Sequence, residues 1–216
     1  MTERVTYDLV IFDCDGVLVD TEPIHDRIFA ELATTVGLVM SAEEINNRFR
    51  GLSTSSSVAI VEELVGRPVP LDFVDNMERL VAASYPQELK LVDGVVEALD
   101  RISVPVCVAS SGKLERVQLI LEMMGIADRF HGNVFSGAKV AHGKPAPDLF
   151  VWAARAMGAD PGRCAVIEDS VFGVQAGVAA GMKVFGYAGG IEPDLLAREG
   201  AHVFGDMREL PGLISG

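Results

Sequence analysis

The stretch LVIFDCDGVLVD, residues 9–20, decides the fold of this chain. It opens with a short apolar run and then places Asp13 and Asp15 beside Gly16. A short apolar run that ends at turn residues predicts a buried strand. Because open α/β sheets bind their ligands at the carboxyl ends of strands, both carboxylates lie where such a sheet has its site. Taken alone, the Asp-x-Asp-Gly pattern is also compatible with a surface turn or a calcium loop.

Five further short apolar runs follow along the chain. They cover residues 105–109, 133–135, 165–167, 183–185 and 202–204. Most are separated by an amphipathic stretch of helical length, such as the one that ends at Gly125 and the one that Pro147 opens. Strands that alternate with helices predict a parallel sheet covered on both faces. The fold class is therefore α/β.

One interval breaks this alternation. Roughly 70 residues, 20–90, pass without a convincing strand, which is far longer than an ordinary connection between a strand and a helix. Apolar side chains recur there at helical spacing, and Ser41 with Glu44 forms a capping-box pattern at one helix start. We therefore predict a helical domain, 20–90, inserted into a catalytic core formed by residues 1–19 and 91–216.

Composition excludes several classes of function. The 216 residues carry 18 Lys and Arg against 31 Asp and Glu, for a formal net charge of −13. Such a surface repels nucleic acid and anionic membranes, so neither is an expected partner. We expect neither a signal peptide nor a membrane span, because the first apolar run, residues 9–12, is short and no stretch of about 18 apolar residues follows it. Cys14, Cys107 and Cys164 form no Cys-x-x-Cys pair and are expected to be buried, which fits a cytoplasmic protein. We expect a monomer.

Polar residues follow two more of the predicted strands. Ser110 and Ser111 come after the second strand and before a helix, a position that either cradles phosphate or caps the helix. Lys144 lies in a loop stiffened by two prolines, and its alternative interpretation is a solvated surface lysine. Glu168 and Asp169 end the fourth strand. Together these residues predict hard oxygen ligands for Mg²⁺ beside a cation and N–H donors for a phosphoryl group.

With these four motifs, the chain resembles the haloacid dehalogenase superfamily along essentially its whole length. It is most similar to the branch that carries an α-helical cap after the first motif, which includes β-phosphoglucomutases and sugar-phosphate phosphatases. The resemblance implies a Rossmann-like parallel sheet as the core, with the insert as a cap domain that closes over the substrate.

The resemblance also implies a role for each motif residue. Asp13 corresponds to the nucleophile that forms an aspartyl-phosphate, and Asp15 to the general acid. Mg²⁺ would be held by side chains of Asp13, Glu168 and Asp169 and by the backbone carbonyl of Asp15. The residues implied to contact phosphate or substrate are Ser110, Ser111, Lys144, Lys113, His25 and Arg50. Lys113 is equally compatible with a helix-surface lysine, and His25 with a structural histidine.

Departures from the family pattern narrow the expected activity. The dehalogenases lack the second acid, Asp15, and residues 20–89 hold no lysine for the Schiff base of a phosphonoacetaldehyde hydrolase. Thr54 stands where β-phosphoglucomutases have the arginine that grips a second phosphate. We therefore expect a phosphatase for a small phosphorylated metabolite, a sugar phosphate or a sugar-acid phosphate such as 6-phosphogluconate. A phosphosugar mutase is the alternative within enzymes.

A signalling module offers an alternative from another class. Response-regulator receivers also combine strand-end acids, a hydroxyl and a lysine. They place the phosphorylated aspartate on a middle strand and carry no large cap, whereas here we expect the middle strand to end in Ala109-Ser110, without an acid. Both differences favour the enzyme.

Overall fold

The computed structural model describes residues 7–49 and 54–215, apart from the side chain of Ser55. The chain divides into two compact units, Met1–Asp20 with Lys90–Gly216, and Thr21–Leu89. We call them the core unit and the helical unit. The borders differ by one residue at each end from the predicted domains. The reason is a small antiparallel sheet of β2 (Val19–Asp20) and β3 (Lys90–Leu91), which pairs Asp20 with Lys90 inside the core unit.

The core unit is built on a six-stranded sheet with the order β5-β4-β1-β6-β7-β8, and all its neighbouring strands are parallel. The strands are β1 (Leu9–Phe12), β4 (Val106–Ser110), β5 (Val134–Ser136), β6 (Cys164–Glu168), β7 (Lys183–Tyr187) and β8 (His202–Phe204). All six predicted runs contribute a strand, which confirms the α/β class and the Rossmann-like parallel core.

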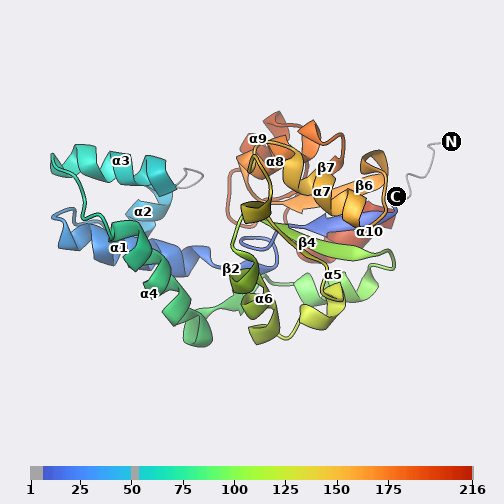
Figure 1. The fold of residues 1–216 in the computed structure, drawn as a ribbon, viewed down its shortest axis with the longest axis horizontal. Coiled ribbons are helices and arrows are strands. Elements are labelled where there is room, and N and C mark those ends of the chain that lie inside the picture. Colours follow the sequence, from blue (N-terminus) through green and yellow to red (C-terminus); the bar gives the residue numbers. More distant parts are fainter. Residues whose placement is uncertain (1–6, 50–53, 216) are drawn as a thin grey trace. The chain divides into compact units, whose positions relative to one another are not determined.

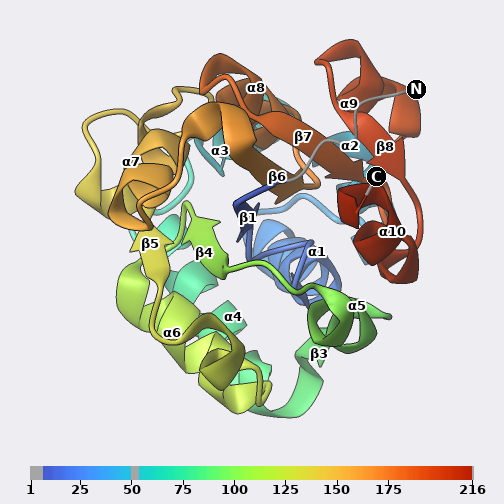
Figure 2. The same cartoon turned by 90° about the vertical axis from the view of Figure 1, so that its right-hand side faces the viewer.

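Helices cover both faces of this sheet, as Figures 1 and 2 show. On one face lie α7 (Asp148–Ala156), α8 (Val171–Ala179) and α9 (Pro193–Arg198), which pack against the strands and in sequence against one another. On the other face lie α5 (Val95–Arg101), α6 (Leu114–Met123) and α10 (Leu210–Ser215). Short 3-10 helices span Ala127–Phe130, Gly137–Lys139, Pro161–Arg163 and Met207–Glu209.

Strand β1 lies in the interior of the sheet, between β4 and β6. All its residues are buried, and Leu9 and Ile11 join the apolar cluster that contains Leu149 and Phe150 of α7. The acid-bearing strand is therefore first in the sequence but a middle strand in space. Strand position does not distinguish this chain from a receiver, contrary to the prediction, and the helical insert is the difference that remains. The three cysteines are buried and free, as predicted.

The helical unit contains α1 (Glu22–Thr35), α2 (Ala42–Phe49), α3 (Thr54–Val65) and α4 (Phe73–Glu88). The predicted capping box is confirmed: the Glu44 amide donates to Ser41 Oγ at 3.2 Å, and the Ser41 amide donates to Glu44 Oε2 at 2.7 Å. The rings of Phe29, Phe49 and Phe73 meet in the core of this unit. Among the described residues, no helix has the length and apolar character needed to cross a membrane.

Candidate active site

Asp13 directly follows β1 and is fixed by its backbone. Its amide donates to the carbonyl of Ile167 in β6 at 3.0 Å, which extends the parallel pairing one residue beyond the strand. The residue is 8% exposed, so the surface-turn interpretation of this motif is wrong. Burial raises the pKa of Asp13 to about 7, although the nearby Lys144 ammonium opposes that rise. The strand thus holds a carboxylate in a place where its charge needs partners.

Lys144 supplies the cationic partner. Its Nζ lies 2.6 Å from Asp13 Oδ1 and 2.6 Å from Glu168 Oε1, and it donates to the Ala109 carbonyl at 3.3 Å. The ammonium also lies 4.9 Å from the ring centroid of Phe150. The side chain is 6% exposed, so the solvated-lysine interpretation is wrong. Burial disfavours its charge, but the two carboxylates outweigh that effect and hold the pKa of Lys144 above its ordinary value.

Glu168 ends β6 and is held through its second oxygen. Both the amide and the hydroxyl of Ser170 donate to Glu168 Oε2 at 2.9 Å, while Ser170 Oγ accepts the Gly173 amide at 3.0 Å and caps α8. A Cβ at position 173 would lie 1.8 Å from Glu168 Oε1. The start of α8 therefore needs a glycine because the carboxylate occupies the space of a side chain.

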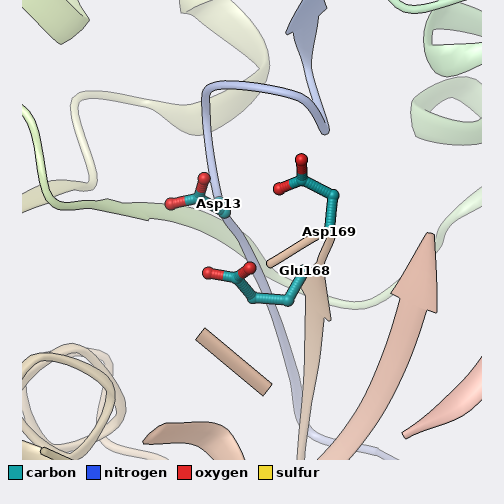
Figure 3. A group of neighbouring side chains, drawn as sticks. All are labelled: Asp13, Glu168 and Asp169. Atoms are coloured by element: carbon teal, nitrogen blue, oxygen red, sulfur yellow. The ribbon is translucent and has the colours of Figure 1, made fainter. Parts of the chain in front are cut away.

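Asp169 completes an acidic cluster with Asp13 and Glu168. Figure 3 shows the three side chains rising from the ends of β1 and β6 at one edge of the sheet. One carboxylate oxygen from each lies within 4.8 Å of the others. Gly16, with φ +77°, gives Asp169 its place, because a Cβ there would lie 2.0 Å from Asp169 Oδ2. Three carboxylates from two adjacent strands form a hard oxygen donor set of the kind that binds Mg²⁺.

The loop after β4 runs beside this cluster. Ser110 is the last residue of β4 and is buried, and its Oγ accepts the Gly112 amide at 3.1 Å. Neither serine caps α6, because the N-cap residue is Lys113, so the capping interpretation is wrong. Ser111 and Lys113 are exposed. Sequence reasoning missed Ser136 at the end of β5, which is buried and donates to the Gly112 carbonyl at 2.6 Å.

Asp15 meets a partner that the sequence analysis did not find. The two terminal nitrogens of Arg116 donate to the two carboxylate oxygens of Asp15 at 2.9 and 2.6 Å. Arg116 lies in the first turn of α6, three residues after Lys113. Residues three apart lie on one face of a helix. The predicted site residue Lys113 was therefore the feature of the sequence that could have pointed to Arg116.

Charge at this edge of the sheet favours a divalent cation. The described side chains include four carboxylates, Asp13, Asp15, Glu168 and Asp169, and two paired cations, Lys144 and Arg116. The carboxylates outnumber these two cations, and their oxygens are of the donor type that Mg²⁺ prefers. The residues present therefore fit the predicted metal.

Two predicted site residues belong to the other part of the chain. His25 lies on α1, half-buried, and lines a cavity of about 190 Å³ within the helical unit. Asp26, Asn46 and Thr54 line the same cavity, and Asn46 Nδ2 donates to Asp26 Oδ2 at 2.6 Å. Arg50 lies outside the described residues.

An open parallel sheet that gathers acids, a hydroxyl and a lysine at its carboxyl edge has the active-site arrangement of an α/β enzyme. Residues 7–181 match the haloacid dehalogenase-like hydrolase family. The chain belongs to this family and is a hydrolase.

Several relatives resemble the chain along almost its full length. The 6-phosphogluconate phosphatase of Escherichia coli (strain K12) is 30% identical over 95% of this chain and 94% of its own. A haloacid dehalogenase-like protein of Agrobacterium tumefaciens str. C58 has a TM-score of 0.88 and 34% identity, covering 96% of this chain and 97% of its own. A family hydrolase of Deinococcus radiodurans R1, solved with bound phosphate and sodium, has a TM-score of 0.81 and 31% identity, covering 95% and 94%.

Proposed function

We propose that the protein hydrolyses small phosphomonoesters, with Asp13 as the nucleophile, Asp15 as the general acid and base, and Mg²⁺ as the cofactor. The observation that carries this proposal is the buried Asp13 carboxylate, held 2.6 Å from Lys144 Nζ in a cluster with Glu168 and Asp169. A carboxylate fixed at a strand end beside cations is an activated nucleophile for phosphoryl transfer.

The proposed chemistry has two steps. A carboxylate oxygen of Asp13 forms a bond to phosphorus while the bond from phosphorus to the ester oxygen breaks, and Asp15 gives its proton to that leaving oxygen. A water molecule then attacks the phosphorus of the aspartyl-phosphate and passes one proton to Asp15, while the bond from phosphorus to the Asp13 oxygen breaks. Inorganic phosphate leaves, and Asp13 and Asp15 return to their starting states.

The remaining residues would neutralise and orient the phosphoryl group. Mg²⁺, held by the side chains of Asp13, Glu168 and Asp169 and the Asp15 carbonyl, would reduce the repulsion between carboxylate and phosphate. Lys144 and Ser110 would bind phosphoryl oxygens, with the exposed Ser111 and Lys113 next to them in the same loop. His25 and Arg50 would contribute substrate contacts from the helical unit, acting as a cap.

Sugar phosphates and sugar-acid phosphates are the proposed substrates. The 6-phosphogluconate phosphatase from Escherichia coli covers nearly the whole chain, and the Deinococcus radiodurans hydrolase binds phosphate. Both support a small phosphorylated metabolite as the partner of the site. We further propose that the protein acts in the cytoplasm as a monomer.

Phosphate release tests the proposal directly. We expect the purified protein with MgCl₂ to release phosphate from members of a panel of sugar, hexitol and sugar-acid monophosphates. EDTA should abolish this release and excess Mg²⁺ should restore it. Full activity after chelation, with the metal content measured as zero, contradicts the metal assignment. Failure to hydrolyse any phosphomonoester contradicts the function itself.

A second assay separates a phosphatase from a mutase. A mutase must protect its aspartyl-phosphate from water and grip a second phosphate with a strong cation. Thr54 offers only a hydroxyl at the position where the mutases have an arginine. We therefore expect β-glucose 1-phosphate with a trace of the 1,6-bisphosphate to yield free phosphate. Rapid formation of glucose 6-phosphate with little free phosphate contradicts the phosphatase assignment.

A further inference from the structure

The ion pair between Arg116 and Asp15 conflicts with the role proposed for Asp15. Both oxygens of the carboxylate accept hydrogen bonds from Arg116, at 2.9 and 2.6 Å. This parallel arrangement is the strongest geometry in which a guanidinium binds a carboxylate. While it persists, both oxygens of Asp15 are directed at N–H donors of Arg116 rather than at a leaving group. The pair must therefore open during every turnover.

An anion of the substrate is suited to open it. A guanidinium gives up one carboxylate readily when another anion takes the same place, because its donors stay satisfied. The side chains of Arg116 and Asp15 are 29% and 32% exposed, so a solute can reach them. Lys144, by contrast, is buried between Asp13 and Glu168. Of these two paired cations, Arg116 is the one that can change partners.

The position of Arg116 indicates which part of the substrate it meets. Lys144 lies against Asp13, on the side of the phosphoryl group. Asp15 has to reach the leaving oxygen, and Arg116 holds Asp15, so Arg116 lies on the side where the organic part of the substrate is attached. Its planar fork now binds a carboxylate and fits another carboxylate in the same way.

We infer that Arg116 is a specificity-determining residue, which exchanges Asp15 for a carboxylate of the substrate and so makes phosphorylated sugar acids the preferred substrates. The inference rests on the proposed function and narrows it to one substrate class. Binding of the substrate carboxylate and release of Asp15 become one event, and the released carboxylate takes up a proton from water before it acts as the acid. A substrate without that carboxylate leaves Arg116 on Asp15 for a larger part of the time.

Two substrates that differ in one group test the exchange. In 6-phosphogluconate carbon 1 is a carboxylate, whereas in glucitol 6-phosphate it is a hydroxymethyl group. We expect the wild-type protein to have the higher kcat/KM for the acid. Arg116→Gln should lower kcat/KM for the acid by roughly 10- to 100-fold, mainly through KM, and should not lower that for the hexitol phosphate, because Asp15 then has no arginine to leave. Arg116→Lys keeps the charge without the fork and should recover part of the preference.

A matched control separates this effect from a general loss of charge. Arg155→Gln on α7 removes one exposed arginine of the core unit and should leave the ratio of the two kcat/KM values unchanged. Equal losses of Arg116→Gln on both substrates, or a wild-type protein without preference for the acid, overturn the inference. Thermal unfolding of each variant confirms that folded protein is compared.

Hydrolysis of p-nitrophenyl phosphate distinguishes a failure of the Arg116 inference from a failure of the proposed function. Its leaving group departs without help from an acid, so its hydrolysis needs the nucleophile, the metal and Asp15 as the base, but not Asp15 as the acid. If the wild-type protein hydrolyses this ester in Mg²⁺ while the Arg116 variants leave the substrate ratio unchanged, the inference fails and the proposed function stands. If neither this ester nor a sugar monophosphate is hydrolysed, the proposed function itself fails.

Discussion

Two ion pairs at the same edge of the sheet differ in how firmly the molecule holds them. Lys144 is buried and bonded to Asp13 and Glu168 at 2.6 Å each, and Glu168 is fixed further by Ser170. Arg116 and Asp15 form an equally short contact of 2.6 Å, but both side chains are about one third exposed. Distance alone does not distinguish these two pairs, whereas burial does.

The difference assigns different tasks to the two pairs. Groups around Lys144 lie in low dielectric, where preorganised charges act most strongly on a reacting phosphoryl group. Their fixed geometry suits chemistry that is the same for every phosphomonoester. The pair of Arg116 and Asp15 is weaker because water screens it. Its arginine lies on a helix rather than at a strand end. This pair suits recognition of the group that differs between substrates.

Replacing Asp13, the proposed nucleophile, breaks the buried pair and has the largest expected effect on activity. We expect Asp13→Asn to lower phosphate release by about 1,000-fold or more, because the amide neither attacks phosphorus nor binds the metal well. The two side chains have nearly the same shape, so the fold should persist. Phosphate release and thermal unfolding measure the two effects. A folded variant with the wild-type rate contradicts the assignment of the nucleophile.

Stability measurements compare the two cations directly. Lys144→Met leaves two buried carboxylates without their cation and should lower the free energy of unfolding by about 3–5 kcal/mol at neutral pH. Arg116→Gln should cost about 1 kcal/mol or less, because its pair is partly solvated. Chemical denaturation without metal measures both values, and MgCl₂ should restore part of the first loss. Equal losses for the two variants contradict the contrast between the pairs.

Gly173 tests how tightly Glu168, one partner of the buried Lys144, is packed. In an ordinary helix, Gly→Ala stabilises by about 1 kcal/mol. At position 173 the added Cβ would lie 1.8 Å from Glu168 Oε1, so we expect Gly173→Ala to lower the free energy of unfolding by about 2 kcal/mol. Gly212 on α10 has no atom within 4 Å of such a Cβ and is the matched control. Both variants being stabilised would contradict the tight packing of Glu168.

The sequence predicts the fold well because buried parallel strands are continuous apolar runs. Even the capping box of Ser41 and Glu44 is found at the predicted place, since its geometry depends on a few adjacent residues. The motif acids could be grouped because strand ends share one edge of the sheet. Arg116 could not be added to this group from the sequence, because its contact with Asp15 joins residues far apart in the chain and depends on where α6 lies. Gly173 was missed for a similar reason, since its role depends on Glu168.

A third ion pair, more exposed than the other two, extends the comparison to the weakest case. Arg208 donates to both oxygens of Asp93, at 3.1 and 2.8 Å, and these hydrogen bonds hold the pKa of Asp93 below its ordinary value of 3.8. A carboxyl whose pKa is lower in the folded state binds its proton more weakly there than in the unfolded chain. Its contribution to stability is therefore complete above the unfolded pKa and disappears as the pH falls through the folded pKa.

We therefore expect Asp93→Asn to lower the free energy of unfolding slightly at neutral pH. The loss should be smaller than for Lys144→Met or Arg116→Gln, because water and salt screen an exposed contact. The difference from the wild-type protein should shrink as the pH falls below about 4, where the unfolded carboxyl is already protonated. Denaturation of both proteins from pH 7 to pH 3, in low and high salt, measures it. A difference that stays constant over this range would show that Asp93 acts through packing rather than charge, and that burial does not rank the three pairs.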